Sequence, residues 1–279
     1  MTSKEKELKE KLTKIKNNNY ILDGEESYFK LALEMMENIG STDPELRDEL
    51  IYGILFNWII ENKLVQEQLK ELLSISLDKA HVFYKLGDNG EDSVFTRTFS
   101  VLIVALIIYK HNQEAFLSEE ELHDVKDKLV EYMLKEQDIR GYVEVKGWAH
   151  SAAHTSDALD ELAQCDCFNK EDLLDILNSI KIKACTGYYV YIDEESERMV
   201  NAIENSFKRK LLSESEIKEW LNGFTIKNAE YNYMQGFHSK VNIKDFLRSL
   251  YFRLLEQEEY KSIVEEIKNI LNSKTFNRY

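Results

Sequence analysis

Apolar residues recur at intervals of three and four along most of the chain, as in FLRSLYFRLL at residues 246–255. That spacing puts the apolar side chains on one stripe of an α-helix, which buries the stripe against neighbouring helices. The most apolar run, FSVLIVALIIY at residues 99–109, is 11 residues long and falls short of the ~20 residues that cross a bilayer. It predicts a buried core helix over residues 92–111, and the charged start of the chain predicts a helix over residues 1–20. We therefore expect an all-α protein.

Helix starts are expected where Ser, Thr or Asn is followed three residues later by an acid, because the two side chains can satisfy free amides of the first turn. Five pairs have this spacing: Thr42 with Glu45, Ser118 with Glu121, Asn169 with Asp172, Ser213 with Glu216, and Asn242 with Asp245. Glycines fall mostly between the predicted helices, at gaps that resemble the ~40 to 47 residues of HEAT and armadillo repeats. We expect an α-α superhelix of such helical hairpins, forming a single domain over residues 1–279, with an irregular helical bundle as the alternative.

Strand-like sequence is scarce. The segment YYVYI at residues 188–192 is β-branched and aromatic, but it has no partner strand within hairpin distance. We expect it to begin or end a helix and to pack its aromatic rings.

The charge balance and the cysteines narrow the possible partners and surroundings. The chain has 51 acidic and 36 basic residues, a formal net charge of −15, so its average surface potential repels a phosphate backbone. Three cysteines form an odd and sparse set, which argues against a disulfide framework and for a reducing compartment. The first residues, MTSKEKELKEKLTKIK, contain no apolar signal segment. We expect a cytoplasmic protein that binds neither nucleic acid nor membranes.

The stretch GWAHSAAHTSDALDEL at residues 147–162 is the strongest candidate for a site, and we expect a helix there over residues 146–165. At 100° per residue, four polar side chains share one narrow stripe of that helix. These are His150, His154, Asp157 and Glu161. The opposite side is apolar and carries Trp148, Ala152, Leu159, Leu162 and Ala163. The polar stripe faces either a pocket on the concave side of the superhelix or the solvent.

His150 and His154 stand four residues apart, so they can bind one metal ion or form a polar pocket without metal. The residues between them are SAA, so the glutamate of the HExxH metalloprotease motif is missing. Asp157 and Glu161 are near enough to His154 to hold its ring by hydrogen bonds and to raise its pKa. This arrangement suits acid-base catalysis and structural pairing equally, and no cofactor is expected.

A charged loop leads into this helix. Arg140 and Glu144 lie between glycines in the segment RGYVEVKG, residues 140–147. Arg140 could bind a carboxylate or phosphate through two parallel hydrogen bonds, or it could form a salt bridge with Glu136 or Glu144.

Two further arginines could line the same pocket. Arg97 lies one turn into the apolar helix, where a buried guanidinium needs an anion. We expect Asp157, Glu161 or Glu144 to supply that anion. The alternative is that the stem of Arg97 lies along the surface and its guanidinium is in water. Arg248 points either into the same cavity or to solvent. Two arginines facing an acidic helix would suit an anionic small molecule.

Three stretches together resemble a bacterial family known as domain of unknown function 2785: DSVFTRTFS at residues 92–100, GYVEVKGWAHSAAHTSDALDELA at 141–163 and FLRSLYFRL at 246–254. The resemblance covers most of the chain and implies an all-α fold without implying a reaction. Its motif positions correspond to Arg97, Gly147, Trp148, His150, His154 and Asp157. Where the family commonly has glycine after the second histidine, this chain has Thr155.

Two functions remain open, and the sequence does not decide whether the protein is an enzyme. The first is a binding module whose pocket, centred on His150, His154 and Asp157, holds a small molecule or peptide. Further candidates to line it are Arg97, Arg140, Glu144, Trp148, Glu161 and Arg248. The second is a hydrolase or lyase that uses His154 as general acid or base, with or without a divalent metal on His150 and His154. The chain has no GxSxG motif and no glycine-rich phosphate loop.

Overall fold

A computed structural model describes residues 2–24, 26–226 and 231–277. Across these residues the chain forms thirteen α-helices, a π-helical segment, a 3-10 turn and one short hairpin. The helices are α1 (Ser3–Asn17), α2 (Tyr28–Glu37), η1 (Glu45–Tyr52), α3 (Gly53–Ile60), α4 (Gln66–Ser76), α5 (Ser93–Gln113), α6 (Glu119–Lys135), α7 (Ser151–Ala163), α8 (Lys170–Ala184), α9 (Glu195–Lys208), α10 (Glu214–Asn222), α11 (Tyr233–Leu254), η2 (Glu258–Tyr260), α12 (Lys261–Leu271) and α13 (Lys274–Asn277). Strands β1 (Tyr142–Val143) and β2 (Gly147–Trp148) pair antiparallel. The prediction of an all-α protein is confirmed, and the hairpin was not predicted.

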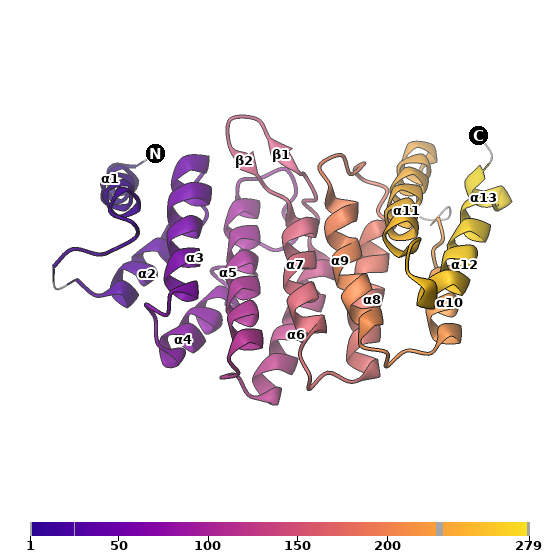
Figure 1. Cartoon of the computed structure of the whole chain (residues 1–279). Coiled ribbons are helices and arrows are strands. Elements are labelled where there is room, and N and C mark those ends of the chain that lie inside the picture. Colours follow the sequence, from indigo (N-terminus) through magenta and orange to yellow (C-terminus); the bar gives the residue numbers. More distant parts are fainter. Residues whose placement is uncertain (1, 25, 227–230, 278–279) are drawn as a thin grey trace.

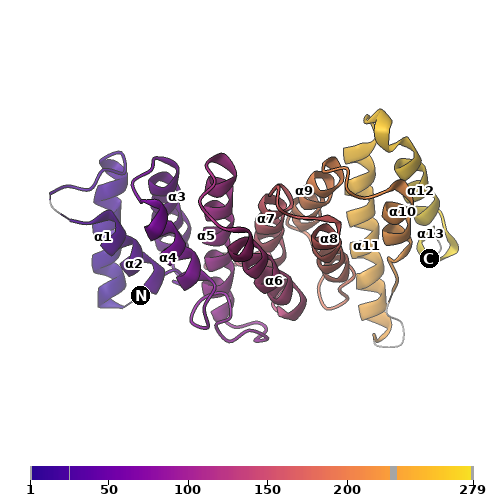
Figure 2. The same cartoon turned by 90° about the horizontal axis from the view of Figure 1, so that it is seen from below.

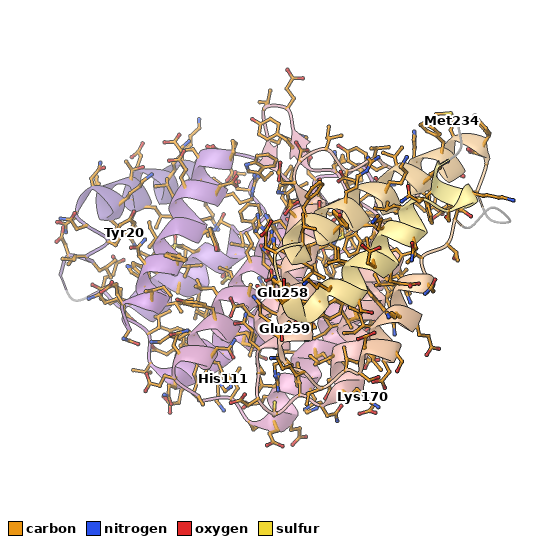
Figure 3. The ribbon with its side chains drawn as sticks, turned by 45° about the vertical axis from the view of Figure 1, so that its right-hand side comes forward. Tyr20, His111, Lys170, Met234, Glu258 and Glu259 are labelled. Carbon is orange, nitrogen blue, oxygen red and sulfur yellow. The ribbon has the colours of Figure 1, made fainter. Side chains whose placement is uncertain are left out.

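The helices follow one another in chain order along the molecule, from α1 at one end to α13 at the other (Figure 1). α3, α5, α7, α9 and α11 stand side by side in one row, and α4, α6 and α8 form a second row against it (Figures 1 and 2). Tyr20 and Met234 accordingly lie far apart, near opposite ends (Figure 3). Within the first row α7 packs between α5 and α9, so residues on α7 meet side chains from both neighbours.

Helix α5 lies at the centre and is buried nearly all round, because helices cover it on several sides. The apolar run at residues 99–109 falls within it, as predicted. With 21 residues and a mean hydropathy of 1.6, α5 is the one helix among the described residues that is long and apolar enough to cross a membrane, and 78% of that stretch is buried inside the protein. At its end, His111 (Figure 3) accepts hydrogen bonds from the backbone amides of Phe116 and Leu117, both at 3.0 Å.

Three of the five predicted helix starts are confirmed. Ser118, Asn169 and Ser213 each accept a hydrogen bond from the amide three residues on, and the acid at that position reaches back to them. The start predicted at Thr42 is wrong by one residue, because Asp43 Oδ1, not Thr42, accepts from the amides of the first turn, those of Glu45 and Leu46 at 3.0 and 3.4 Å. The start predicted at Asn242 is also wrong.

Asn242 lies in the middle of α11 and is 1% exposed. Its amide nitrogen donates to the carbonyls of Thr186 and Tyr189, at 2.9 and 2.8 Å, and its oxygen accepts from the amide of Tyr191 at 3.0 Å. The segment at residues 188–192 is therefore an irregular connection fixed by a side chain, and the prediction that it begins or ends a helix is wrong. It does pack aromatic rings, since Tyr188 contacts Tyr231.

Candidate functional site

The helix that carries His154 begins later than predicted, at Ser151. Gly147 has a φ of +80°, and a Cβ there would lie 2.8 Å from Pro44 Cβ and 3.0 Å from Arg47 Nη2. The chain therefore turns through the β hairpin, and His150 precedes α7 in a left-handed conformation with a φ of 49°. Trp148 consequently lies on β2, not on the apolar side of the helix, where we predicted it. Its ring stacks on the ring of His150, with 4.4 Å between centroids.

Both histidines are buried between α7 and its neighbours. Their exposed fractions are 8% for His150 and 6% for His154, and their ring centroids are 5.7 Å apart. The ring of His154 also contacts the ring of Phe99 on α5 edge-on. Burial lowers the pKa of His154 well below its usual range, and His150 lowers it further. His154 Nδ1 has no hydrogen-bond partner among the described residues.

The two carboxylates of the predicted stripe bind other residues. Asp157 forms an ion pair with Arg198 of α9, whose Nε donates to Asp157 Oδ1 at 2.6 Å. Glu161 accepts a hydrogen bond from Asn112 of α5 at 3.1 Å. The prediction that these acids hold His154 and raise its pKa is therefore wrong. The two histidines of the stripe are buried, whereas Asp157 and Glu161 are half-buried, each bonded to a neighbouring helix.

Arg97 finds its anion elsewhere than predicted. It is fully buried, and its Nε and Nη2 donate to the two carboxylate oxygens of Glu136 at 2.5 and 2.8 Å. Its Nη1 donates to Ser93 Oγ at 2.9 Å and to the carbonyl of Tyr84 at 3.1 Å. The expected counter-ions Asp157, Glu161 and Glu144 do not contact it, because Glu136 at the end of α6 already occupies that position.

The loop before the hairpin is held by an ion pair of its own. Nε and Nη2 of Arg140 donate to the carboxylate of Asp138 at 2.8 and 2.6 Å, so the salt bridge predicted to Glu136 or Glu144 is wrong. Asp138 is two residues away in the sequence and its side chain is fully buried. Glu144 is exposed in the turn between β1 and β2.

Around His150 lies a cluster of side chains that can bind a metal ion, which we did not predict. His150, Asp193 and Glu195 each offer one ligand atom, and these three atoms lie within 4.8 Å of one another. His150 Nε2 is 3.0 Å from the carbonyl oxygen of Asp193 and 3.7 Å from Glu195 Oε1. Burial raises the pKa of Glu195 and lowers that of His150. His154, the second ligand expected from its spacing, is not part of this cluster.

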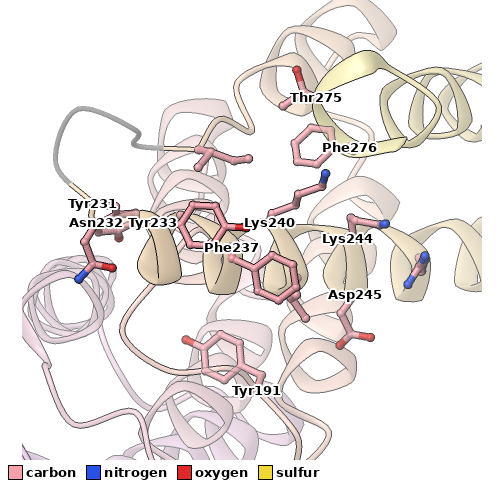
Figure 4. A pocket seen from close by; sticks show the side chains of 14 residues that line it. Tyr191, Tyr231, Asn232, Tyr233, Phe237, Lys240, Lys244, Asp245, Thr275 and Phe276 are labelled. Carbon is pink, nitrogen blue, oxygen red and sulfur yellow. The ribbon is translucent and has the colours of Figure 1, made fainter. Parts of the chain in front are cut away.

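The third predicted arginine, Arg248, lies at a different place. Arg248 lines a cavity of about 800 Å³ beside α11, together with Lys240 and Lys244 of the same helix (Figure 4). Aromatic rings of Tyr191, Phe237 and Phe276 form other parts of its wall, as Figure 4 shows. The described lining includes neither His150 nor His154, so of the two positions considered for Arg248, the one in a cavity shared with the histidines is not found.

Positive charge gathers on the α11 side of this cavity. Lys240, Lys244 and Arg248 are spaced four residues apart, which places them on one face of the helix. Burial and the nearby charges of Arg248 and Lys240 lower the pKa of Lys244. In the described part of the chain, Lys244 and Arg248 have no ion-pair partner. One acid, Asp245, is on the same wall.

These observations define an all-α protein with a buried histidine–carboxylate cluster and a separate cation-lined cavity. The chain belongs to the family described as "Protein of unknown function (DUF2785)", which matches residues 82–252. The matched region contains the histidine–carboxylate cluster and most of α11. No curated protein and no solved structure matches the chain.

Proposed function

We propose that the protein binds a small anionic molecule with an apolar or aromatic body in the cavity beside α11. The observation that carries this proposal is the row of Lys240, Lys244 and Arg248 along a cavity of about 800 Å³, in a chain whose formal net charge is −15. Lys244 and Arg248 lie side by side and repel one another, and a bound anion would relieve that repulsion. An anion would also accept hydrogen bonds from Lys244 and Arg248.

The cavity has the dimensions and the mixed character of a ligand site. Pockets for small molecules commonly enclose about 300–1,000 Å³ and combine apolar walls with a few polar groups. With a rise of about 1.5 Å per residue, positions four apart lie about 6 Å from each other along the helix. One carboxylate or phosphate can therefore contact Lys244 and Arg248 together, while an attached ring packs against Phe237 or Phe276. A small molecule fits this enclosure better than a peptide does.

The arrangement of the helices supports a repeat architecture. We interpret the two rows as an α-α superhelix of hairpins similar to HEAT and armadillo repeats, forming a single domain. In such a protein each helical pair buries its apolar side against its neighbours, and the stack presents an extended surface for binding. We propose a cytoplasmic bacterial protein, with no binding of nucleic acid or membranes, because the net negative charge disfavours phosphate-rich partners.

The acid-base alternative has less support. A general acid or base must come within hydrogen-bond distance of its substrate. His154 is 6% exposed and its ring packs against those of Phe99 and His150. A hydrolase or lyase built on His154 would therefore require α7 to separate from α5 before substrate could reach Nδ1.

The test uses 8-anilinonaphthalene-1-sulfonate, a fluorescent anion with an aromatic body. We expect saturable binding to the wild-type protein, and a dissociation constant at least tenfold higher for the double variant Lys244→Ala/Arg248→Ala. The matched control is Lys128→Ala/Lys135→Ala, which removes two cations from exposed pairs on α6. Equal weakening in the two double variants would show that net charge, not the cavity, governs binding, and the proposal would then be wrong.

A further inference from the structure

Three side chains from two distant parts of the chain converge beside the start of α9. His150 comes from the turn before α7, Asp193 from the connection that leads into α9, and Glu195 is the first residue of α9. Their ligand atoms lie within 4.8 Å of one another, and His150 Nε2 is 3.7 Å from Glu195 Oε1. Ligand atoms around a tetrahedral ion with bonds of about 2.1 Å are about 3.4 Å apart. The three groups would have to move closer together by about 1 Å, mainly by rotation of the His150 ring away from the Asp193 carbonyl, to reach coordination distance.

Glu195 supplies an independent sign that a cation belongs here. The side chain is 1% exposed, and its Oε1 has no hydrogen-bond partner among the described residues. Its other oxygen, Oε2, accepts from the amide of Asp193 at 2.9 Å, which fixes the direction of Oε1. A buried carboxylate oxygen without a donor is costly, since it has given up water and gained nothing in return. A metal ion between Glu195 and His150 would be the missing partner.

The second acid is also held in position. The carboxylate of Asp193 accepts a hydrogen bond from the amide of Tyr142 at 3.0 Å. It lies so close to Gly141 that a Cβ at that position would be 2.0 Å from Asp193 Oδ2. The hairpin thus fixes Asp193 next to His150, which follows the same hairpin. Ligands that are fixed before the ion arrives lose less conformational entropy on binding.

An acidic cavity lies next to Glu195. A cavity of about 240 Å³ is lined by Glu194, Glu195, Glu197 and Asp245, and also by Ser196, whose Oγ is buried without a partner among the described residues. Four carboxylates around a narrow cavity raise the local concentration of cations.

We infer that His150, Asp193 and Glu195 bind a divalent transition-metal ion, with Zn²⁺ and Mn²⁺ as the ions that this donor set suits. One imidazole nitrogen and two carboxylates form a mixed N/O set, and an imidazole ligand favours such ions over Ca²⁺ and Mg²⁺. His150 Nε2 lies 3.0 Å from the carbonyl oxygen of Asp193, which can only accept, so Nε2 donates its proton there in the absence of the ion. Metal binding therefore breaks this hydrogen bond and moves the ring proton to Nδ1, which frees the lone pair of Nε2 for the ion. This site is separate from the anion cavity beside α11, although Tyr191 and Asp245 line both cavities.

The experiment is equilibrium dialysis of the full chain against Zn²⁺ and, separately, Mn²⁺, with bound metal measured by elemental analysis. We expect one tight site per chain, weakened at least tenfold in Glu195→Gln and in His150→Gln. Glu197→Gln is the matched control, because Glu197 lines the same cavity but pairs with Arg253 at its exposed side. It should bind both ions as the wild type does.

A second readout guards against loss of folding in the variants. The wild-type protein should melt at a higher temperature with the metal than without it, and this increase should vanish in Glu195→Gln. The inference is overturned if neither ion binds wild type more tightly than Glu195→Gln, or if Glu197→Gln weakens binding as much. Binding of the fluorescent anion should be unchanged in metal-free Glu195→Gln, so the two proposals fail or succeed separately.

Discussion

The guanidinium of Arg97 and the carboxylate of Glu136 are joined by two hydrogen bonds of 2.5 and 2.8 Å, and the side chains are 0% and 2% exposed. The pair connects the central helix α5 to the end of α6. Lys183 of α8 donates to the backbone carbonyl of Glu136 at 2.7 Å, so three helices meet at this residue. With its guanidinium engaged by these partners, Arg97 acts as a structural residue that holds the two rows of helices together.

Replacing Arg97 by Met should strongly destabilise the protein. The substitution leaves Glu136 as a buried carboxylate without its counter-ion, and breaking such a pair costs about 3–5 kcal/mol. Urea denaturation followed by circular dichroism measures the change. The double variant Arg97→Met/Glu136→Leu should recover most of the loss, because both charges are then gone. Lys128→Met breaks an exposed ion pair and should cost about 0–1 kcal/mol of unfolding free energy. A cost of Arg97→Met as small as that would contradict a structural role for Arg97.

Because of Lys183, the unfolding free energy of the protein should increase with pH above about pH 8. Burial lowers the pKa of Lys183 to about 8 in the folded protein, against an ordinary value of 10.5. Between these values the unfolded chain binds more protons than the folded chain, so the unfolding free energy increases with pH, by up to about 1.4 kcal/mol per unit. Below pH 8 both states bind the proton and this contribution is constant. The unfolding free energy of the wild type minus that of Lys183→Met should therefore increase from pH 8 to 10. A difference that stays constant over this range would contradict the lowered pKa of Lys183.

Gly147→Ala should be more harmful than the same change at Gly90. Both glycines have a φ near +80°, where an alanine costs about 1–2 kcal/mol. At Gly90 nothing lies within 4 Å of the added Cβ, whereas at Gly147 it would meet Pro44 and Arg47 at 2.8 and 3.0 Å. The extra crowding should add about 1–3 kcal/mol to the loss of unfolding free energy. Equal losses in thermal or urea denaturation would show that the hairpin can move away from η1.

Asn242→Ala should loosen the connection between α8 and α9. Three backbone groups lose a buried partner, each at a cost of about 1–3 kcal/mol, so we expect a loss of at least about 2 kcal/mol. Hydrogen exchange at the amide of Tyr191 should become much faster. Asn222→Ala removes an exposed side chain that bonds Lys218 and Glu266, and it serves as the control. Unchanged protection at Tyr191 would mean that other contacts hold the segment.

Features set by neighbouring residues could be predicted from the sequence, whereas features set by distant residues could not. The all-α fold, the core of α5 and the starts at Ser118, Asn169 and Ser213 depend on spacing within one or two turns. Asn242 has the same local spacing as a helix start, yet its partners are more than 50 residues away in the sequence. Local pattern alone therefore assigned it to the wrong structure.

The predicted partners within the candidate site were wrong for the same physical reason. A helical periodicity tells which side chains share a face, but not which helix packs against that face. Arg97 with Glu136, Asp157 with Arg198, and His150 with Asp193 each join residues 39 to 43 positions apart. The row of Lys240, Lys244 and Arg248 did have a readable signal, its spacing of four residues, and the sequence alone could have indicated a cationic face there.

The measurement that tests the proposed function most directly is a crystal structure of the protein grown with 8-anilinonaphthalene-1-sulfonate. We predict the sulfonate within about 3 Å of Lys244 Nζ and the Arg248 guanidinium, with the naphthalene ring against Phe237 or Phe276. A ligand bound elsewhere on the chain, with the cavity beside α11 filled only by solvent, would contradict the account.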